Sequence, residues 1–85
     1  MLVRGDVQGV GFRYFTQRQA ARMNLVGWVR NLPDGDVEVY LEGEEDDIRR
    51  MIQILSRGPD YARVDEVKET WRTPSGSFSD FRITY

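Results

Sequence analysis

A glycine-rich stretch near the start of this 85-residue chain constrains its fold more than any other feature. Three glycines fall within seven residues of the segment Gly5–Arg13. A short apolar pair, residues 2 and 3, precedes them, and an apolar pattern of helical spacing begins at Phe12. Glycine accepts sharp backbone bends and lets a ligand come close, because it has no Cβ atom. The stretch therefore predicts a strand, a tight loop and a helix in immediate succession.

The predicted helix start has the features of an anion-binding site. The first backbone N–H groups of a helix have no partner inside it, and the helix dipole adds positive potential there. Arg13 would add a planar charge with paired donors in the first turn. Together these groups suit a tetrahedral dianion such as a phosphoryl group. The pattern alone fits a simple strand-to-helix turn with a solvated Arg13 equally well, because glycine-rich turns of this kind are common.

The composition excludes several kinds of site. The chain has neither Cys nor His, so it lacks a thiolate nucleophile, the commonest general base and the commonest metal ligand. Its net charge of −2 argues against nucleic acid as a partner, because binding a phosphate backbone needs a basic surface. No apolar run approaches the roughly 18 residues of a membrane span, and the N-terminus does not resemble a signal peptide. We therefore expect a cytoplasmic protein with no metal or other cofactor.

The periodicity of apolar residues predicts seven elements. Two stretches have helical spacing, and five have the alternation or composition of strands. The first strand is short, and the poor alternation of the fourth suits the edge of a sheet. The predicted strands cover residues 1–4, 25–32, 36–43, 64–73 and 78–85, and the predicted helices cover residues 12–23 and 44–57.

Each predicted helix has an apolar stripe that would face one side of the sheet. Strand 25–32 offers two faces, and hydrophobicity alone does not choose between them. We place Gly27 on the helix side, because a missing side chain lets a helix approach closely. This choice puts Asn31 on the same side, at the end of the strand. The stripes consist of Phe12, Phe15, Gln19, Ala20 and Met23 in the first helix and of Ile48, Met51, Ile52 and Leu55 in the second.

Turn residues mark the ends of these elements. Asn24 predicts a left-handed stop after the first helix, and Gly58 predicts the end of the second. Residues 33–35 predict a tight turn between two strands. The acidic residues 44–47 predict a solvated helix start rather than a metal site, because negative charge complements the helix dipole. Residues 9–15 could alternatively form an aromatic strand that stacks on RNA bases, but the chain lacks the basic surface of such a domain.

The order of the elements and of two motifs resembles one family. The first six elements give the split βαβ arrangement, with two helices on one face of an antiparallel sheet. The order Gly-x-Val-Gln-Gly-Val-x-Phe-Arg, which ends at Arg13, and the segment Gly27–Glu38 resemble the two motifs of the acylphosphatases at the spacing of that family. The segments Gly58–Val64 and Phe81–Tyr85 are also similar to family members.

The resemblance implies the fold and the domain organisation. It implies an α+β, ferredoxin-like βαββαβ sandwich with a mostly antiparallel sheet, in a single acylphosphatase-like domain over residues 1–85. The first strand of this family usually starts several residues earlier. We therefore expect the short first strand to keep its place inside the sheet only if Leu2 and Val3 pair on both sides.

The resemblance also implies a reaction. Acylphosphatases hydrolyse the carboxyl-phosphate anhydride of small acyl phosphates to a carboxylate and inorganic phosphate by direct attack of water. Such a site needs no metal, because a carboxylate leaves readily and fixed charges stabilise the transition state of phosphoryl transfer. On the matching positions, Arg13 would clamp the phosphoryl group and Asn31 would hold the water. The phosphate-binding loop would consist of Gln8, Gly9, Val10, Gly11, Phe12 and Arg13.

Several expectations accompany this reaction. Inorganic phosphate should bind at the loop and compete with the substrate. Trp28 and Tyr85 should pack on the sheet rather than form platforms for the substrate. A monomer is expected, because the pattern shows no surplus apolar face. Two other interpretations are a non-catalytic ferredoxin-like module that binds an anion or a partner, and the acylphosphatase-like domain that precedes larger carbamoyl-transfer enzymes, which we do not expect in a chain of this length.

Overall fold

The computed structural model describes residues 1–85 as five strands and two helices. The strands are β1 (Leu2–Asp6), β2 (Val26–Asn31), β3 (Val37–Glu42), β4 (Arg63–Lys68) and β5 (Phe81–Ile83), and the helices are α1 (Phe12–Arg22) and α2 (Glu45–Arg57). Neither helix combines the length and the apolar character that crossing a lipid bilayer requires.

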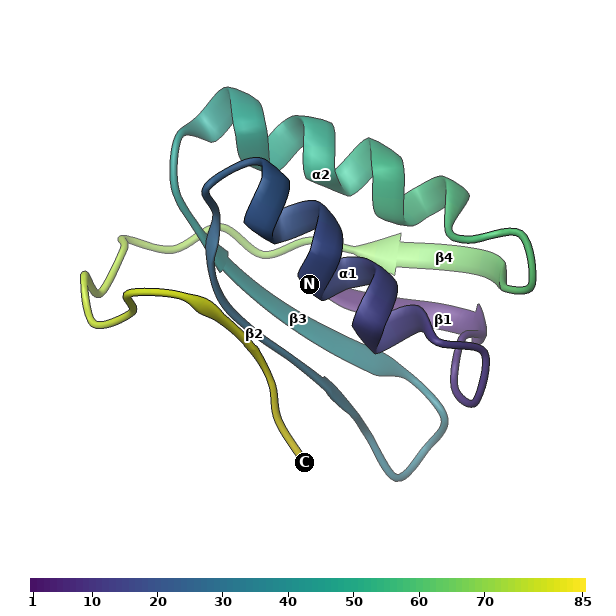
Figure 1. Ribbon diagram of the computed structural model, residues 1–85. Coiled ribbons are helices and arrows are strands. Elements are labelled where there is room, and N and C mark those ends of the chain that lie inside the picture. The colour runs from purple at the N-terminus through teal and green to yellow at the C-terminus, as the bar shows by residue number, and fades with distance from the viewer.

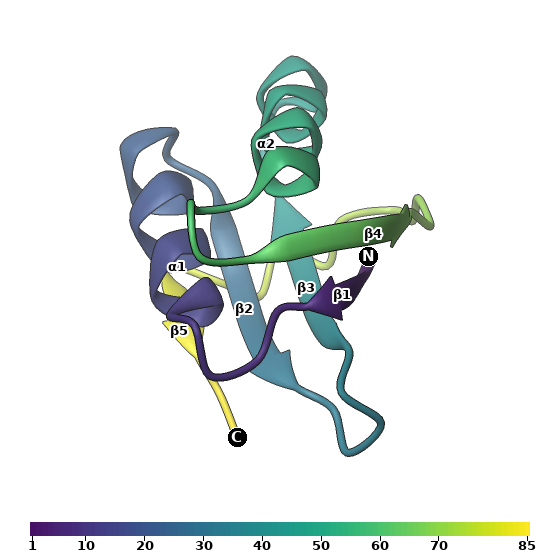
Figure 2. The same cartoon turned by 90° about the vertical axis from the view of Figure 1, so that its right-hand side faces the viewer.

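The strands form one sheet in the order β4-β1-β3-β2-β5. Neighbouring strands are antiparallel except for β2 and β5, which run parallel. The short strand β1 lies inside the sheet, because Leu2 and Val3 pair with β3 on one side and with β4 on the other. Strand β4 lies at an edge, as its poor alternation predicts. Both helices cover the same face (Figures 1 and 2), which confirms the ferredoxin-like α+β sandwich.

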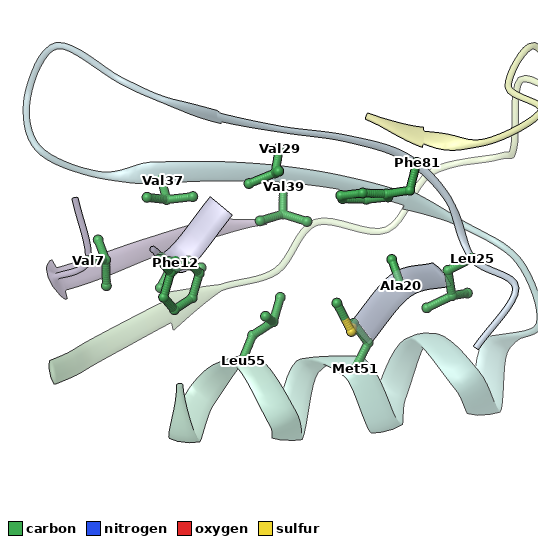
Figure 3. Close-up of a cluster of buried hydrophobic side chains, with 11 residues drawn as sticks. Val7, Phe12, Ala20, Leu25, Val29, Val37, Val39, Met51, Leu55 and Phe81 are labelled. Atoms are coloured by element: carbon green, nitrogen blue, oxygen red, sulfur yellow. The ribbon is translucent and has the colours of Figure 1, made fainter. Parts of the chain in front are cut away.

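The hydrophobic core lies between the helices and the sheet (Figure 3). Met51 and Leu55 of α2 point toward the sheet, and Phe12 and Ala20 contribute from α1. Thr16 of α1 is also fully buried, although the predicted stripe omits it. Its hydroxyl donates to the Phe12 carbonyl oxygen at 2.8 Å, so the polar group is satisfied locally and can lie among apolar side chains.

Gly27 lies on the buried face of β2 together with Leu25 and Val29, as predicted. The physical reason for a glycine here differs from the expected one. Gly27 has a φ of 136°, and an added Cβ atom would meet the Tyr40 carbonyl oxygen of β3 at 1.9 Å. The glycine therefore permits the close approach of the neighbouring strand rather than of a helix.

Three boundaries differ from an expectation or decide between alternatives. Helix α1 begins at Phe12, so residues 9–15 do not form the aromatic strand of an RNA-binding domain. Strand β4 ends at Lys68 rather than at residue 73, because it pairs with β1 only as far as Leu2. Strand β5 covers three residues rather than residues 78–85. The chain from 69 to 80 instead forms an irregular connection between the two edges of the sheet.

A buried carboxylate holds this connection against the end of β3. The Glu42 carboxylate accepts hydrogen bonds from the backbone N–H and the hydroxyl of Ser75, both at 2.7 Å, from the Gly76 N–H at 3.1 Å, and from the Tyr40 hydroxyl. These donors, the Tyr40 hydroxyl first among them, lower the pKa of Glu42 to about 2. Glu42 is only 6% exposed, so the donors replace the water that the charged group gives up on folding.

Glu42→Gln is expected to lower the free energy of unfolding at neutral pH. It should also make the free energy of unfolding depend less on pH in the acid range. The folded-state pKa of about 2 lies below the ordinary value of 4.5. The ionised form therefore contributes stability above pH 4.5 that is lost as the pH falls toward 2. Urea unfolding from neutral pH downward should show a difference between wild type and variant that shrinks across this window.

Asp60→Asn is the matched control for this prediction. Asp60 is exposed in the connection between α2 and β4 and takes part in no ion pair. Its loss should leave the acid dependence of unfolding close to that of the wild type. If the free energies of unfolding of wild type and Glu42→Gln differ by the same amount from neutral pH downward, the role assigned to Glu42 is contradicted.

Candidate active site

The loop between β1 and α1 leaves its backbone amides free. Gly11 precedes α1 in the left-handed conformation, with a φ of 76°, and no side chain caps the start of the helix. None of the N–H groups from Gln8 to Tyr14 donates a hydrogen bond within the protein, whereas the Phe15 N–H donates to the Gly11 carbonyl oxygen at 2.9 Å. An added Cβ atom at Gly9 or Gly11 would meet nothing within 4 Å. The loop therefore presents an open array of donors that suits an anion.

The charges around the loop also favour an anion. The first turn of α1 has no acidic residue, whereas the first turn of α2 has Glu45, Asp46 and Asp47. Arg13 lies in the first turn of α1, partly buried, and takes part in none of the ion pairs of the structure. Its guanidinium therefore keeps its donors for a ligand. No group of acidic side chains in the structure could hold a metal ion.

Asn31 carries an unusual buried acceptor at the end of β2. Its Oδ1 atom is buried and has no hydrogen-bond partner in the protein. A buried polar atom without a partner is rare in folded proteins and costs roughly 1–3 kcal/mol. Such an atom is explained where a ligand or a bound water supplies the missing donor.

The side chain of Gln8 joins the loop to the hairpin that carries Asn31. Its Nε2 atom donates to the carbonyl oxygens of Leu32 and Asp36, both at 2.8 Å. The loop after β1, the turn between β2 and β3, and the C-terminal end all lie at the same end of the molecule (Figures 1 and 2). The two sequence motifs are therefore brought together in space. The spacing of residues predicts Gln8 as a loop residue but does not show where its side chain points.

The C-terminal residue reaches the same end of the sheet. Strand β5 runs parallel to β2, and its last residue, Ile83, pairs with Val29, two residues before Asn31. The Arg13 Cζ atom lies 5.1 Å from the centre of the Tyr85 ring. The Tyr85 side chain is 96% exposed, so the prediction that it packs on the sheet is wrong.

The other aromatic residue singled out in the sequence behaves as expected. The Trp28 ring stacks on the Tyr40 ring of β3, with 5.9 Å between their centres. Two hollows of the surface, of about 570 and 470 Å³, lie between α1 and the start of β5 and beside residues 68–74. Neither is lined by residues 7–13 or by Asn31. The candidate site is instead recognised by its unpaired donors, and a group as small as phosphate can be held by such donors.

Comparison with known proteins shows the family of the chain. The family model described as Acylphosphatase matches residues 1–83. The chain belongs to the acylphosphatase family. It is therefore a hydrolase.

Relatives from bacteria match over nearly their whole length. Acylphosphatases of Moorella thermoacetica and Dehalococcoides mccartyi are 50% and 45% identical to this chain. The alignments cover 96% and 99% of this chain and 87% and 93% of the two relatives. The crystal structure of acylphosphatase from Bacillus subtilis superimposes with a TM-score of 0.94 at 39% identity, over 99% of this chain and 93% of that one.

The contact of Arg13 with Tyr85 leads to a prediction about phosphate binding by this acylphosphatase family member. Tyr85→Leu is expected to weaken binding of inorganic phosphate about two- to fivefold, because an exposed cation–π contact contributes about 0.5–1 kcal/mol. The contact would be lost together with the orientation that it gives to the guanidinium. Calorimetric titration with phosphate measures the change. Tyr85→Phe keeps the ring and should bind like the wild type, and equal weakening by both variants would contradict the prediction.

Proposed function

We propose that the chain hydrolyses the carboxyl-phosphate anhydride of small acyl phosphates to a carboxylate and inorganic phosphate. The observation that carries the proposal is the loop of unpaired amides at the start of α1, with Arg13 outside every ion pair in the first turn of the helix. The loop and the β2–β3 turn lie at the same end of the molecule (Figures 1 and 2), and Asn31, with its unpartnered Oδ1, is the last residue of β2 before that turn. These groups are donors for an anion and an acceptor for water. They are the parts that a hydrolytic phosphoryl transfer needs.

In the proposed reaction, the loop amides from Gln8 to Arg13 and the Arg13 guanidinium hold the phosphoryl oxygens. The Asn31 Oδ1 accepts a hydrogen bond from a water and turns its lone pair toward phosphorus. A new bond forms between the water oxygen and phosphorus, and the bond between phosphorus and the acyl oxygen breaks. The carboxylate leaves with the electron pair, and the water protons remain with phosphate and solvent.

These residues suffice for catalysis because they can stabilise the negative charge of the transition state. Phosphoryl transfer is loose, and negative charge spreads over the three equatorial oxygens. Fixed N–H donors and a planar guanidinium stabilise that charge without having to reorganise during the reaction. A carboxylate is a stable leaving group, so the site needs no general acid. All these groups belong to one chain, and we propose that a monomer is sufficient for activity.

Release of phosphate from benzoyl phosphate in the presence of EDTA tests the proposal. We expect hydrolysis to continue at an unchanged rate when the chelator is added, and inorganic phosphate to inhibit it competitively. Binding of phosphate without turnover would instead support the non-catalytic, anion-binding module. Hydrolysis that stops with EDTA and returns with a divalent cation would contradict the proposed reaction.

A further inference from the structure

The side-chain amide of Gln8 donates both of its N–H groups to the β2–β3 hairpin. A primary amide has two N–H donors. Both point to the neck of the β2–β3 hairpin, where the carbonyl oxygens of Leu32 and Asp36 accept at 2.8 Å each. The side chain is therefore committed to the hairpin and has no donor left for a ligand in the loop.

These two carbonyl groups close the turn that follows Asn31. The Leu32 N–H donates to the Asp36 carbonyl oxygen at 2.8 Å, and the Gly35 N–H donates to the Leu32 carbonyl oxygen at 3.2 Å. Each oxygen thus accepts one bond from the turn and one from Gln8. A shift of the Gln8 side chain would therefore be transmitted to Leu32 and to its immediate neighbour Asn31.

The sheet connects β1 with the end of β2 only as far as Val3, because Val37 of β3 pairs with Val3 on one side and with Asn31 on the other. Strand β3 lies between β1 and β2, and β1 pairs with it only at Leu2 and Val3. From Arg4 onward β1 follows β4 instead. The bonds of Gln8 are the only hydrogen bonds between residues 7–11 and residues 31–36. Beyond Val3, the segment that leads into the loop is joined to the hairpin by the Arg4–Asp36 ion pair at 3.1 Å and by the two bonds of Gln8. Of these contacts, only those of Gln8 come from the loop itself.

We infer that Gln8 is a positioning residue that sets the place of the Asn31 carboxamide relative to the loop amides. The inference rests on the proposed function, in which the loop holds the phosphoryl group and Asn31 holds the attacking water. In-line attack requires the water to lie opposite the leaving oxygen, and a misplacement of about 1 Å can cost about a hundredfold in rate. Gln8 acts through Asn31 and does not itself touch the reacting atoms.

Gln8→Met tests the inference, because it keeps the shape of the side chain and removes both donors. We expect kcat for benzoyl phosphate to fall about ten- to a hundredfold, while the inhibition constant of phosphate stays within about twofold because the loop amides are untouched. The matched control is Gln17→Met. Gln17 also donates from its amide to a backbone carbonyl, that of Phe81 at 3.4 Å, but it does so away from the loop. Its replacement should leave kcat near the wild-type value.

A double-mutant cycle with Asn31→Ala separates positioning from a general structural effect. If Gln8 acts through Asn31, replacing Gln8 in the Asn31→Ala background should change kcat less than about twofold. Fully additive losses in kcat would overturn the inference. Rates are normalised to the folded fraction from circular dichroism. Gln8→Glu, which places acceptors opposite the two carbonyl oxygens, should lose at least as much activity as Gln8→Met.

A measurement without catalysis distinguishes this inference from the proposed function. In NMR spectra, the side-chain amide signals of Asn31 and the N–H signal of Leu32 should move in Gln8→Met and stay in place in Gln17→Met. If the wild-type protein releases no phosphate but the signals still move in Gln8→Met, the proposed reaction is wrong and the link between Gln8 and Asn31 stands. If the wild type is active, the inference is overturned when Gln8→Met is equally active, or when the NMR signals of Gln8→Met do not move.

Discussion

Arg13→Lys is expected to lower kcat/KM for benzoyl phosphate about a thousandfold while the protein remains folded. The magnitude follows from the contribution of a guanidinium to phosphoryl transfer, which is typically about 10³- to 10⁵-fold. Lysine keeps the charge, but a single ammonium cannot hold two oxygens in one plane. Arg13 forms no ion pair that the fold depends on, so the melting temperature should change by only a few degrees. Steady-state kinetics and thermal unfolding of the same preparation measure both quantities.

Arg18→Lys is the control for this substitution. Arg18 lies in the same helix, and its guanidinium also lies over an aromatic ring, that of Tyr14 at 5.6 Å. It is exposed and belongs to neither motif. The same chemical change there should leave kcat/KM within about twofold of the wild type. An Arg13→Lys enzyme with near wild-type activity would remove Arg13 from the proposed reaction.

Asn31→Ala is expected to lower kcat about 10²- to 10³-fold, as the loss of one oriented polar group in an active site usually does. The inhibition constant of phosphate should change little, because Asn31 is proposed to hold the water and not the phosphoryl group. The free energy of unfolding should stay the same or rise by about 1 kcal/mol, because the variant no longer buries an unpaired acceptor. Kinetics, phosphate inhibition and urea unfolding measure the three quantities.

Measuring activity and stability together distinguishes a residue that serves catalysis from one that serves packing. A residue that serves packing would lose stability together with activity, whereas Asn31 should lose activity alone. Asn31→Asp gives a contrasting variant, because it adds a negative charge beside the bound dianion and should weaken phosphate binding as well. Parallel losses of kcat and phosphate affinity in Asn31→Ala would contradict the assignment of the water to Asn31.

The fold follows from the sequence wherever local chemistry and pattern agree. Asn24 adopts a φ of 55° after α1, Gly35 a φ of 97° in the β2–β3 turn, and Gly58 ends α2, each as its residue type predicts. The prediction that Gly27 lies on the buried face is confirmed, but the reason given for a glycine there was wrong. The backbone of β3, and not a helix, comes close to Gly27. Such a close approach between strands depends on twist and register, which the alternation of residues does not encode.

The parts of the structure that were missed depend on contacts between distant residues. The sequence shows Glu42 as one polar position of an alternating strand, and its partners Ser75 and Gly76 lie more than thirty residues away. Tyr85 looked like a strand residue because apolar and polar residues alternate before it, yet β5 ends at Ile83. Arg13 and Asn31 could be singled out through the motifs, whereas the Gln8 side chain could be placed only once the hairpin was seen beside the loop.

The place of β1 inside the sheet has a consequence for synthesis of the chain. Leu2 is synthesised well before its partners Glu38 and Lys68. The β2–β3 hairpin can form locally, whereas β1 must wait for segments made much later, and such non-local pairing slows folding. A nascent chain that stops short of β4 would leave β1 without one of its two neighbours and the following loop without a frame. We therefore expect incomplete translation products to lack affinity for phosphate altogether.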